Sequence, residues 1–174
     1  MSRLSQYPAC RTRPGRYHRT PLHLYLIRHA HALDGENDAA RPLSPKGRKQ
    51  IRSVARLLRE AGVFDPAEIW HSPLRRAHET AAVLAKRLQS RARLREVAGL
   101  APDDAADLIA KKLGDLRYPV AVVGHEPQLS ALASLLVVEA AAPPRFKMKK
   151  CAVLRLDRVG GGWSVRWHIS PELL

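Results

Sequence analysis

The sequence predicts an α/β fold with three layers, in which helices cover both faces of a mostly parallel central sheet and an antiparallel C-terminal hairpin completes the sheet. Short apolar runs rich in strand-forming residues alternate with longer segments whose apolar residues recur at helical spacing. This alternation favours parallel strands joined by helical crossovers. The last two apolar segments flank Gly160, Gly161 and Gly162, which predicts the hairpin.

Turn and capping residues place the boundaries of these elements. Ser44 is expected to cap a helix that begins at Pro45, and Gly62 to close it. The first strand ends abruptly at Arg28 and His29. In chain order we expect strand 22–27, helix 45–62, strand 68–71, helix 74–88, strand 94–97, helix 102–116, strand 119–124, helix 127–138, and strands 152–156 and 164–169.

The length of 174 residues suits a single domain with a full core. Residues 1–21 hold five arginines, three prolines and no acidic residue, so we expect a flexible extension there and one domain over 22–174. No apolar stretch approaches the roughly 20 residues of a membrane span, so we expect a cytoplasmic protein without membrane contact. Cys10 and Cys151 have no metal-ligand or redox spacing, and are expected to be a thiol of the extension and a strand residue.

The formal net charge of +14 implies a surface that attracts anionic partners. Such a field draws phosphorylated, acidic or nucleic-acid partners without choosing among them, and general solubility explains the charge equally well. Aromatic residues make up 5% of the chain and no nucleic-acid-binding motif is present. A nucleic acid is therefore not the favoured partner.

Histidine and arginine residues lie at the ends of three predicted strands. Arg28 and His29 follow the first strand, Arg76 lies in the first turn of the helix after the second, and His125 follows a later one. In open α/β sheets, ligands bind beyond the carboxyl ends of the strands. We therefore expect these four side chains to form one site.

Those residue types suit phosphoryl transfer. A neutral imidazole is a nucleophile toward phosphorus. Flanking guanidinium groups lower the pKa of a histidine below its usual value of about 6.5 and bind phosphoryl oxygens through paired hydrogen bonds. Two histidines and two arginines together would stabilise a phosphoryl transition state without a metal, so no metal or other cofactor is expected.

Three segments carry a resemblance to a known family. They are LIRHA at 26–30, SPLRRAHET at 72–80 and GHEP at 124–127. In this order they resemble the histidine phosphatase superfamily, which includes phosphoglycerate mutases and acid phosphatases. The resemblance covers about residues 22–172 and implies a phosphoglycerate mutase-like fold.

Within that superfamily the chain resembles most the SixA-type phosphohistidine phosphatases. The resemblance implies that His29 is the phosphorylated nucleophile and that Arg28, Arg76 and His125 hold the phosphate. It makes Arg41 a further candidate for phosphate or substrate contact. The segments that carry this closer resemblance are 28–30 (RHA), 41–47 (RPLSPKG), 100–102 (LAP) and 170–174 (SPELL).

The chain also departs from the family pattern. His31 stands where an acidic residue is frequent, and His71 stands where a small residue is common. Each is expected to be a partly buried bystander, with a place at the edge of the pocket as the alternative. No general acid can be matched: Asp103 and Asp104 are expected to cap a helix, and Glu126 could face solvent.

The leading hypothesis is a phosphatase that removes phosphate from phosphohistidine on a protein, such as a histidine phosphotransfer domain. Imidazole leaves more easily than an alkoxide, so this reaction needs less acid assistance, and the absence of a long lid-forming insertion suits a protein substrate. One alternative is a phosphatase for small phosphomonoesters or polyphosphate. Another is a non-catalytic basic module that binds phosphate groups or nucleic acid. Phosphoglycerate mutase activity is not favoured, because the chain is short and lacks the matching acid segment.

Overall fold

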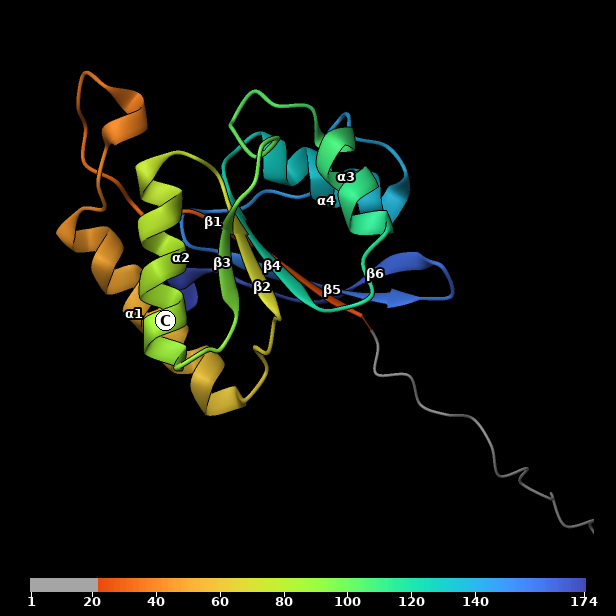
Figure 1. The fold of residues 1–174 in the computed structure, drawn as a ribbon, viewed down its shortest axis with the longest axis horizontal. Helices are drawn as coiled ribbons and strands as arrows, with labels where there is room; N and C mark the ends of the chain where they lie inside the picture. The colour runs from red at the N-terminus through yellow and green to blue at the C-terminus, as the bar shows by residue number, and fades with distance from the viewer. Residues whose placement is uncertain (1–21) are drawn as a thin grey trace, which may run out of the picture.

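The computed structural model describes residues 22–174, which form one six-stranded sheet between two layers of helices (Figure 1). The strand order is β3-β2-β4-β1-β5-β6. Strands β1 to β4 run parallel, and β5 is antiparallel to both of its neighbours. The predicted fold class is confirmed. The strands are β1 (His23–Arg28), β2 (Glu68–His71), β3 (Arg93–Glu96), β4 (Val120–Gly124), β5 (Val153–Val159) and β6 (Gly162–Ile169).

Helices α1 and α2 cover one face of the sheet, and α3 and α4 cover the other (Figure 1). Alternating residues of β1 point to the two faces, as the two-residue period of a strand requires. Tyr25 and Ile27 pack in the core beneath α1 and α2, whereas Leu24 and Leu26 pack beneath α3 and α4. The helices are α1 (Pro45–Ala61), α2 (Arg75–Leu88), α3 (Ala106–Gly114) and α4 (Gln128–Val138), with short 3-10 helices η1 (Asp38–Ala40) and η2 (Pro171–Leu173).

The predicted boundaries of α1 are confirmed by its caps. The Ser44 side chain accepts a hydrogen bond from the backbone N–H of Gly47 at 3.0 Å, and Pro45 occupies the first helical position. Gly62 ends the helix in the left-handed conformation, with φ of 62°. These local interactions fix the start of α1 and therefore the length of the loop between β1 and α1.

Helix α3 is shorter than the sequence predicts. It begins at Ala106 rather than Pro102, and its N-cap, Ala105, makes no side-chain cap. The Asp104 carboxylate instead accepts a hydrogen bond from the Ala101 N–H at 2.7 Å and closes the preceding turn. The expectation that Asp103 or Asp104 caps this helix is wrong, because the Asp104 carboxylate is already hydrogen-bonded within the turn that precedes the helix.

The expected extension over 1–21, with Cys10 and His18, lies outside the described residues. Within residues 22–174, no helix combines the length and apolar character that a membrane span needs. Cys151 is buried and stands just before β5 rather than inside it.

We expect Gly47→Ala to lower the free energy of unfolding by about 1–3 kcal/mol, because a side chain there would overpack the structure. A Cβ at Gly47 would overlap the backbone carbonyl of His31, in the loop between β1 and α1. Urea unfolding of the two proteins measures the loss. In the matched control Gly114→Ala, nothing lies within 4 Å of the added Cβ, and stability should stay the same or rise. Equal effects of the two changes would contradict the packing argument.

Candidate active site

The predicted histidines and arginines meet beyond the carboxyl ends of β1, β2 and β4. His29 follows β1, His125 follows β4, and Arg76 lies in the first turn of α2 after β2. The rings of His29 and His125 are 4.9 Å apart between centroids. The structure therefore brings the residues of three separate segments to one edge of the sheet, where ligands bind in such folds.

His29 is held on both its backbone and its ring. Its N–H donates to the Gly124 carbonyl at 2.9 Å, and its own carbonyl accepts from the Cys151 N–H at 3.2 Å. The ring atom Nδ1 lies 2.7 Å from the Ala30 carbonyl oxygen. Because a carbonyl can only accept, Nδ1 carries the ring proton in this contact, and Nε2 keeps its lone pair.

A threonine of α2 locks this loop to the helix that carries Arg76. The Thr80 hydroxyl accepts from the Ala30 N–H at 3.1 Å and donates to the Arg76 carbonyl at 2.6 Å. Thr80 is fully buried. It fixes His29 and Arg76 relative to each other without facing the site itself.

His125 is almost fully buried and bonds to the turn after β2. Its Nε2 lies 2.8 Å from the Ser72 hydroxyl, which also accepts from the Leu74 N–H at 3.2 Å. When Ser72 donates its hydroxyl to Nε2, Nδ1 carries the ring proton. That Nδ1 is buried and has no hydrogen-bond partner within residues 22–174.

Two arginines complete the cluster. One Arg28 nitrogen, Nη1, donates to the Met148 carbonyl at 2.8 Å, while its buried Nε has no partner in the described part of the chain. Arg76 donates through Nη1 to the Asp38 carbonyl at 2.8 Å and through Nη2 to the Asp38 carboxylate at 3.0 Å. An oxyanion of the ligand would supply acceptors for the two orphan donors, Arg28 Nε and His125 Nδ1.

Burial keeps both histidines neutral. Burial, with a smaller contribution from the charges of His125, Arg76 and Arg28 and against the bond to Ala30, lowers the pKa of His29 from 6.5 to about 3. Burial, with Arg76 and Arg28 and against the opposing charge of Asp38, lowers the pKa of His125 to about 4. At neutral pH the Nε2 of His29 is therefore unprotonated, as a nucleophile must be.

Asp38 was not among the residues singled out in the sequence, yet its carboxylate lies on the Arg76 guanidinium. It belongs to the 3-10 helix η1, in the loop between β1 and α1. Hydrogen bonds from Arg41 and Arg76 lower the pKa of Asp38, so it is ionised at neutral pH. It occupies a place where Arg76 would otherwise bind an anion.

Arg41, the further candidate for phosphate contact, forms its hydrogen bonds within that same loop. Its three guanidinium nitrogens donate to the Leu33 carbonyl at 2.7 Å, the Asp38 carboxylate at 2.8 Å and the Asp34 carboxylate at 3.2 Å. These bonds use three of the five guanidinium N–H donors, so phosphate contact does not require any of them to break. That role stays a prediction, and in this structure Arg41 orders the loop that carries Asp38.

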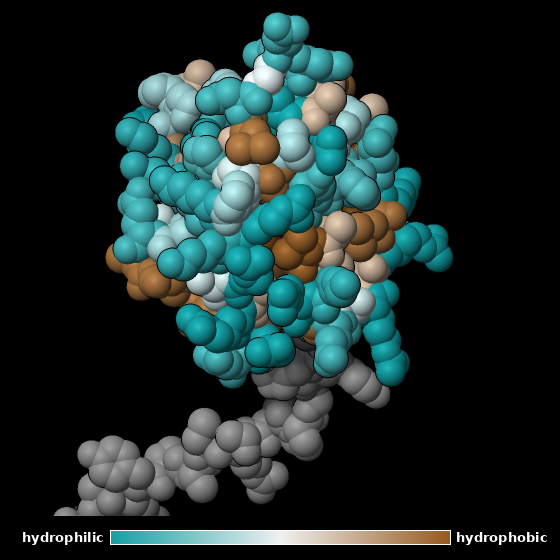
Figure 2. All heavy atoms as spheres, turned by 90° about the vertical axis from the view of Figure 1, so that its left-hand side faces the viewer, coloured by the Kyte–Doolittle hydropathy of each residue, from teal (hydrophilic) through white to brown (hydrophobic). Residues whose placement is uncertain are grey.

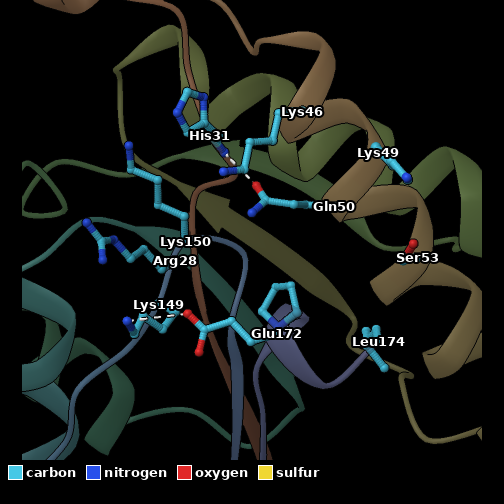
Figure 3. A pocket seen from close by; sticks show the side chains of 11 residues that line it. Arg28, His31, Lys46, Lys49, Gln50, Ser53, Lys149, Lys150, Glu172 and Leu174 are labelled. Carbon is cyan, nitrogen blue, oxygen red and sulfur yellow. Dashed lines mark hydrogen bonds and ion pairs between the residues drawn. The ribbon is translucent and has the colours of Figure 1, made fainter.

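A cavity of about 580 Å³ adjoins the cluster at Arg28 (Figure 3). Arg28, His31, Lys46 and Lys150 surround one part of it, and η2 closes another (Figure 3). Burial, Arg28 and Arg41 lower the pKa of Lys150. His31 is partly buried and lines this cavity beside the site, and its Nδ1 lies 2.9 Å from the Ser44 hydroxyl.

The remaining histidines within residues 22–174 make no hydrogen bond or ring contact with His29 or His125. His71 is buried at the end of β2, with Nδ1 3.0 Å from the Ser72 carbonyl oxygen, and its ring packs on that of exposed His78. His23 contacts Asp157 at 2.9 Å, and His168 lies in β6. His71 does not line the cavity beside Arg28.

Sequence reasoning missed Ser72 and Thr80 as supporting residues. Both lie inside the segment that carried the family resemblance, and Thr80 follows Arg76 by one helical turn, so the spacing could have indicated that they share a face. Asp38 had no such signal, because 38 residues separate it from its partner Arg76. Glu126 is half-buried rather than free in solvent, and burial raises its pKa.

A three-layer α/β fold with two histidines and two arginines at the carboxyl ends of its strands suits phosphoryl transfer. Residues 24–101 match the model of the histidine phosphatase superfamily (branch 1). The chain is 27% identical over 155 residues to the phosphohistidine phosphatase SixA of Escherichia coli (strain K12), covering 86% of this chain and 94% of that protein.

Solved structures agree with this match. The protein histidine phosphatase SixA complexed with tungstate superposes with a TM-score of 0.79 at 23% identity, over 87% of this chain and 99% of that one. A phosphoserine phosphatase mutant from Entamoeba histolytica, in complex with phosphoserine, gives a TM-score of 0.64 at 18% identity, over 88% and 99%. Over residues 24–101 the chain is similar to the histidine phosphatase superfamily, and in sequence and fold it is similar to the SixA type.

The depressed histidine pKa values predict a loss of stability in acid. Because the folded pKa of His29 is about 3 and that of His125 about 4, against about 6.5 unfolded, the unfolded chain binds more protons below pH 6.5. Stability should therefore fall as the pH drops from 6.5 toward 4. Between pH 7 and pH 5, His29→Gln should lose on the order of 1–2 kcal/mol less than the wild type in urea unfolding. Equal losses would mean that His29 titrates normally.

The Asp38 contact predicts competition with anions for Arg76. Asp38→Asn removes the carboxylate charge, so inhibition by inorganic phosphate should tighten roughly threefold to tenfold. The inhibition constant of inorganic phosphate, measured for wild type and Asp38→Asn in steady-state hydrolysis assays, tests this. Asp34→Asn is the matched control, because the Asp34 carboxylate is fully exposed and, within residues 22–174, its ion-pair partner is Arg41 rather than Arg76. A constant that is unchanged or weaker in Asp38→Asn would contradict the competition.

Proposed function

We propose that this chain is a phosphohistidine phosphatase that acts on a protein and carries the phosphoryl group on His29. The observation that supports this most is the ring of His29, whose Nδ1–H donates to the Ala30 carbonyl at 2.7 Å and leaves Nε2 free. The same bond stabilises the positive charge that the ring acquires when Nε2 becomes phosphorylated. Arg28 and His125 each hold a buried nitrogen without a hydrogen-bond partner within residues 22–174, to which a phosphoryl oxygen could bind.

The proposed reaction has two displacements at phosphorus. In the first, Nε2 of His29 forms a bond to phosphorus while the bond from phosphorus to the substrate imidazole breaks, and that imidazole leaves with its electron pair and takes up a proton. In the second, the oxygen of a water molecule bonds to phosphorus while the bond from phosphorus to Nε2 of His29 breaks, the electron pair returns to Nε2, and the water loses a proton to solvent as inorganic phosphate departs. Arg28, Arg76 and His125 would neutralise the charge on the equatorial oxygens in both steps.

The loops around the site support a protein substrate. The connections after β2 and β4 are short, since α2 begins at Arg75 after β2 ends at His71, and α4 begins at Gln128 after β4 ends at Gly124. Neither of these two connections can fold over the site as a lid, and the longer connection between β1 and α1 contacts the site through Asp38 on Arg76. A phosphorylated side chain presented on another protein can approach His29 from this edge.

Hydrolysis of small phosphomonoesters is the second candidate, and Glu126 is the observation that favours it. Glu126 follows His125, is half-buried, and has a pKa raised by burial, so it could donate a proton to a leaving alkoxide. Asp38 is a poorer donor because its two arginine partners keep it ionised. Turnover of a phosphomonoester without turnover of phosphohistidine would favour this candidate.

A labelling experiment tests the proposed nucleophile. Wild type, His29→Ala and His78→Ala are each incubated briefly with a histidine phosphotransfer domain that carries radioactive phosphohistidine, then quenched in base. Wild type should carry acid-labile, base-stable label, and His29→Ala should carry none and lose at least about a thousandfold in turnover. His78→Ala, which changes an exposed imidazole outside the cluster, should keep both. Full activity of His29→Ala would contradict the mechanism.

A further inference from the structure

Helix α1 presents a stripe of unusually dense positive charge. Lys49, Arg52, Arg56 and Arg59 recur at intervals of three and four residues, so they share one face of the helix. All four are exposed. We call this set the basic stripe, and it extends about 15 Å along α1 at 1.5 Å per residue.

The positive charge is concentrated on one helix layer. Helices α1 and α2 together carry ten lysines and arginines and two glutamates, whereas α3 and α4 carry two lysines and one aspartate. Figure 2 shows the side of the molecule on which α1 and α2 lie as mostly hydrophilic, with only separate apolar patches. A partner on this face would meet charge rather than a continuous apolar surface.

The arrangement is unfavourable for the helix itself. No residue of the basic stripe forms an ion pair with another residue of the described range 22–174. Like charges at these spacings repel each other. The first turn of α1 contains Lys46 and no acidic residue, although the helix dipole favours negative charge there. Local stability therefore does not account for the stripe.

The basic stripe is continuous with the cavity beside the active site. Lys49 and Ser53 line both that cavity and the next hollow, whose other lining residues are all arginines. Figure 3 shows Lys46 and Lys49 on α1 across the cavity from Arg28 and Lys150. Cationic side chains thus run without a break from Arg28, beside the nucleophile, to Arg59 at the far end of α1. The arginines of the second hollow are Arg52, Arg56, Arg59 and Arg87.

We propose that the basic stripe is the docking surface for an acidic protein surface that flanks the phosphohistidine of the substrate. This inference rests on the proposed function, and it specifies what kind of protein is the substrate. Carboxylates on the partner would pair with the stripe while the phosphohistidine enters beside Arg28 and reaches His29. Long-range attraction would raise the association rate and make it sensitive to salt.

The dimensions and lining of this surface favour a protein partner. A small phosphorylated metabolite cannot reach the active site and the far end of a stripe about 15 Å long together. No phenylalanine, tyrosine or tryptophan lines either hollow, so the stacking platforms that hold single-stranded nucleic acid are absent from them. Carboxylates repeated along a helix would match the stripe by spacing and by charge.

Two matched peptides test the proposal. Both are helical and carry one phosphohistidine; one repeats glutamate at every third or fourth position, and the other has glutamine at those positions. At low salt the wild type should have a kcat/KM roughly tenfold higher for the glutamate peptide, and the ratio should approach one as salt rises. Arg52→Gln, Arg56→Gln and Arg59→Gln combined should bring the ratio close to one at low salt.

Two further variants separate the position of the charge from its amount. Arg91→Gln, Arg93→Gln and Arg166→Gln combined remove the same charge from exposed sites on β6 and around β3 and should keep the ratio. Arg52→Lys, Arg56→Lys and Arg59→Lys combined keep the charge on α1 and should also keep it. A variant that fails to fold would lose activity with both peptides. Because the measured quantity is the ratio of the two kcat/KM values, misfolding is not mistaken for a loss of docking.

Several outcomes would overturn the docking surface. One is that the wild type has equal kcat/KM values for the two peptides. Another is that the ratio of these values falls equally in the α1 glutamine variant and in the glutamine variant on β6 and around β3. Tighter binding of duplex DNA than of the glutamate peptide, lost in the α1 glutamine variant, would assign the stripe to nucleic acid instead. No turnover of either peptide by the wild type would contradict the proposed function itself, which keeps the two failures distinct.

Discussion

The parallel pairing of β1 with β4 is the constraint on which the candidate site depends. In this register Arg28 lies opposite Gly124, so the next residues along the two strands are His29 and His125. The His29 N–H then bonds to the Gly124 carbonyl. A shift of one residue would turn every side chain of β1 to the other face of the sheet. The buried residues of both layers oppose such a shift, and so the core on either side of the sheet aligns the two imidazoles.

This register brings histidines and arginines together in a cluster whose polar groups are not fully stabilised by the rest of residues 22–174. Burial disfavours the charged forms of both histidines and lowers the pKa of Arg28, while two buried donors have no partner among residues 22–174. An oxyanion would relieve both deficits at once, because it supplies acceptors and negative charge to a site already in place. The structure has thus placed the donors before a ligand arrives, and the ligand does not have to order them.

Much of this arrangement is accessible from the sequence. Strands and helices are separated by clear caps and breakers, and His29 and His125 stand directly at strand ends, so the topology alone brings them to one edge. The contact between Asp38 and Arg76 is different, because it depends on how a polar loop folds back over α2. The start of α3 was missed for a similar reason, since Asp104 could cap a helix or close a turn and only the folded chain decides between them.

Cys151 places a buried thiol beside the backbone of the candidate site. Its N–H donates to the carbonyls of Arg28 and His29, so the residue is part of the backbone support for the nucleophile. Its thiol is buried, and burial raises its pKa to about 12, so almost none of it is thiolate near neutral pH. Peroxide and alkylating reagents act on the thiolate, so they should react only slowly with Cys151 and should not alter the candidate site through it. The phosphoryl transfer proposed at His29 therefore does not depend on a residue that is readily oxidised.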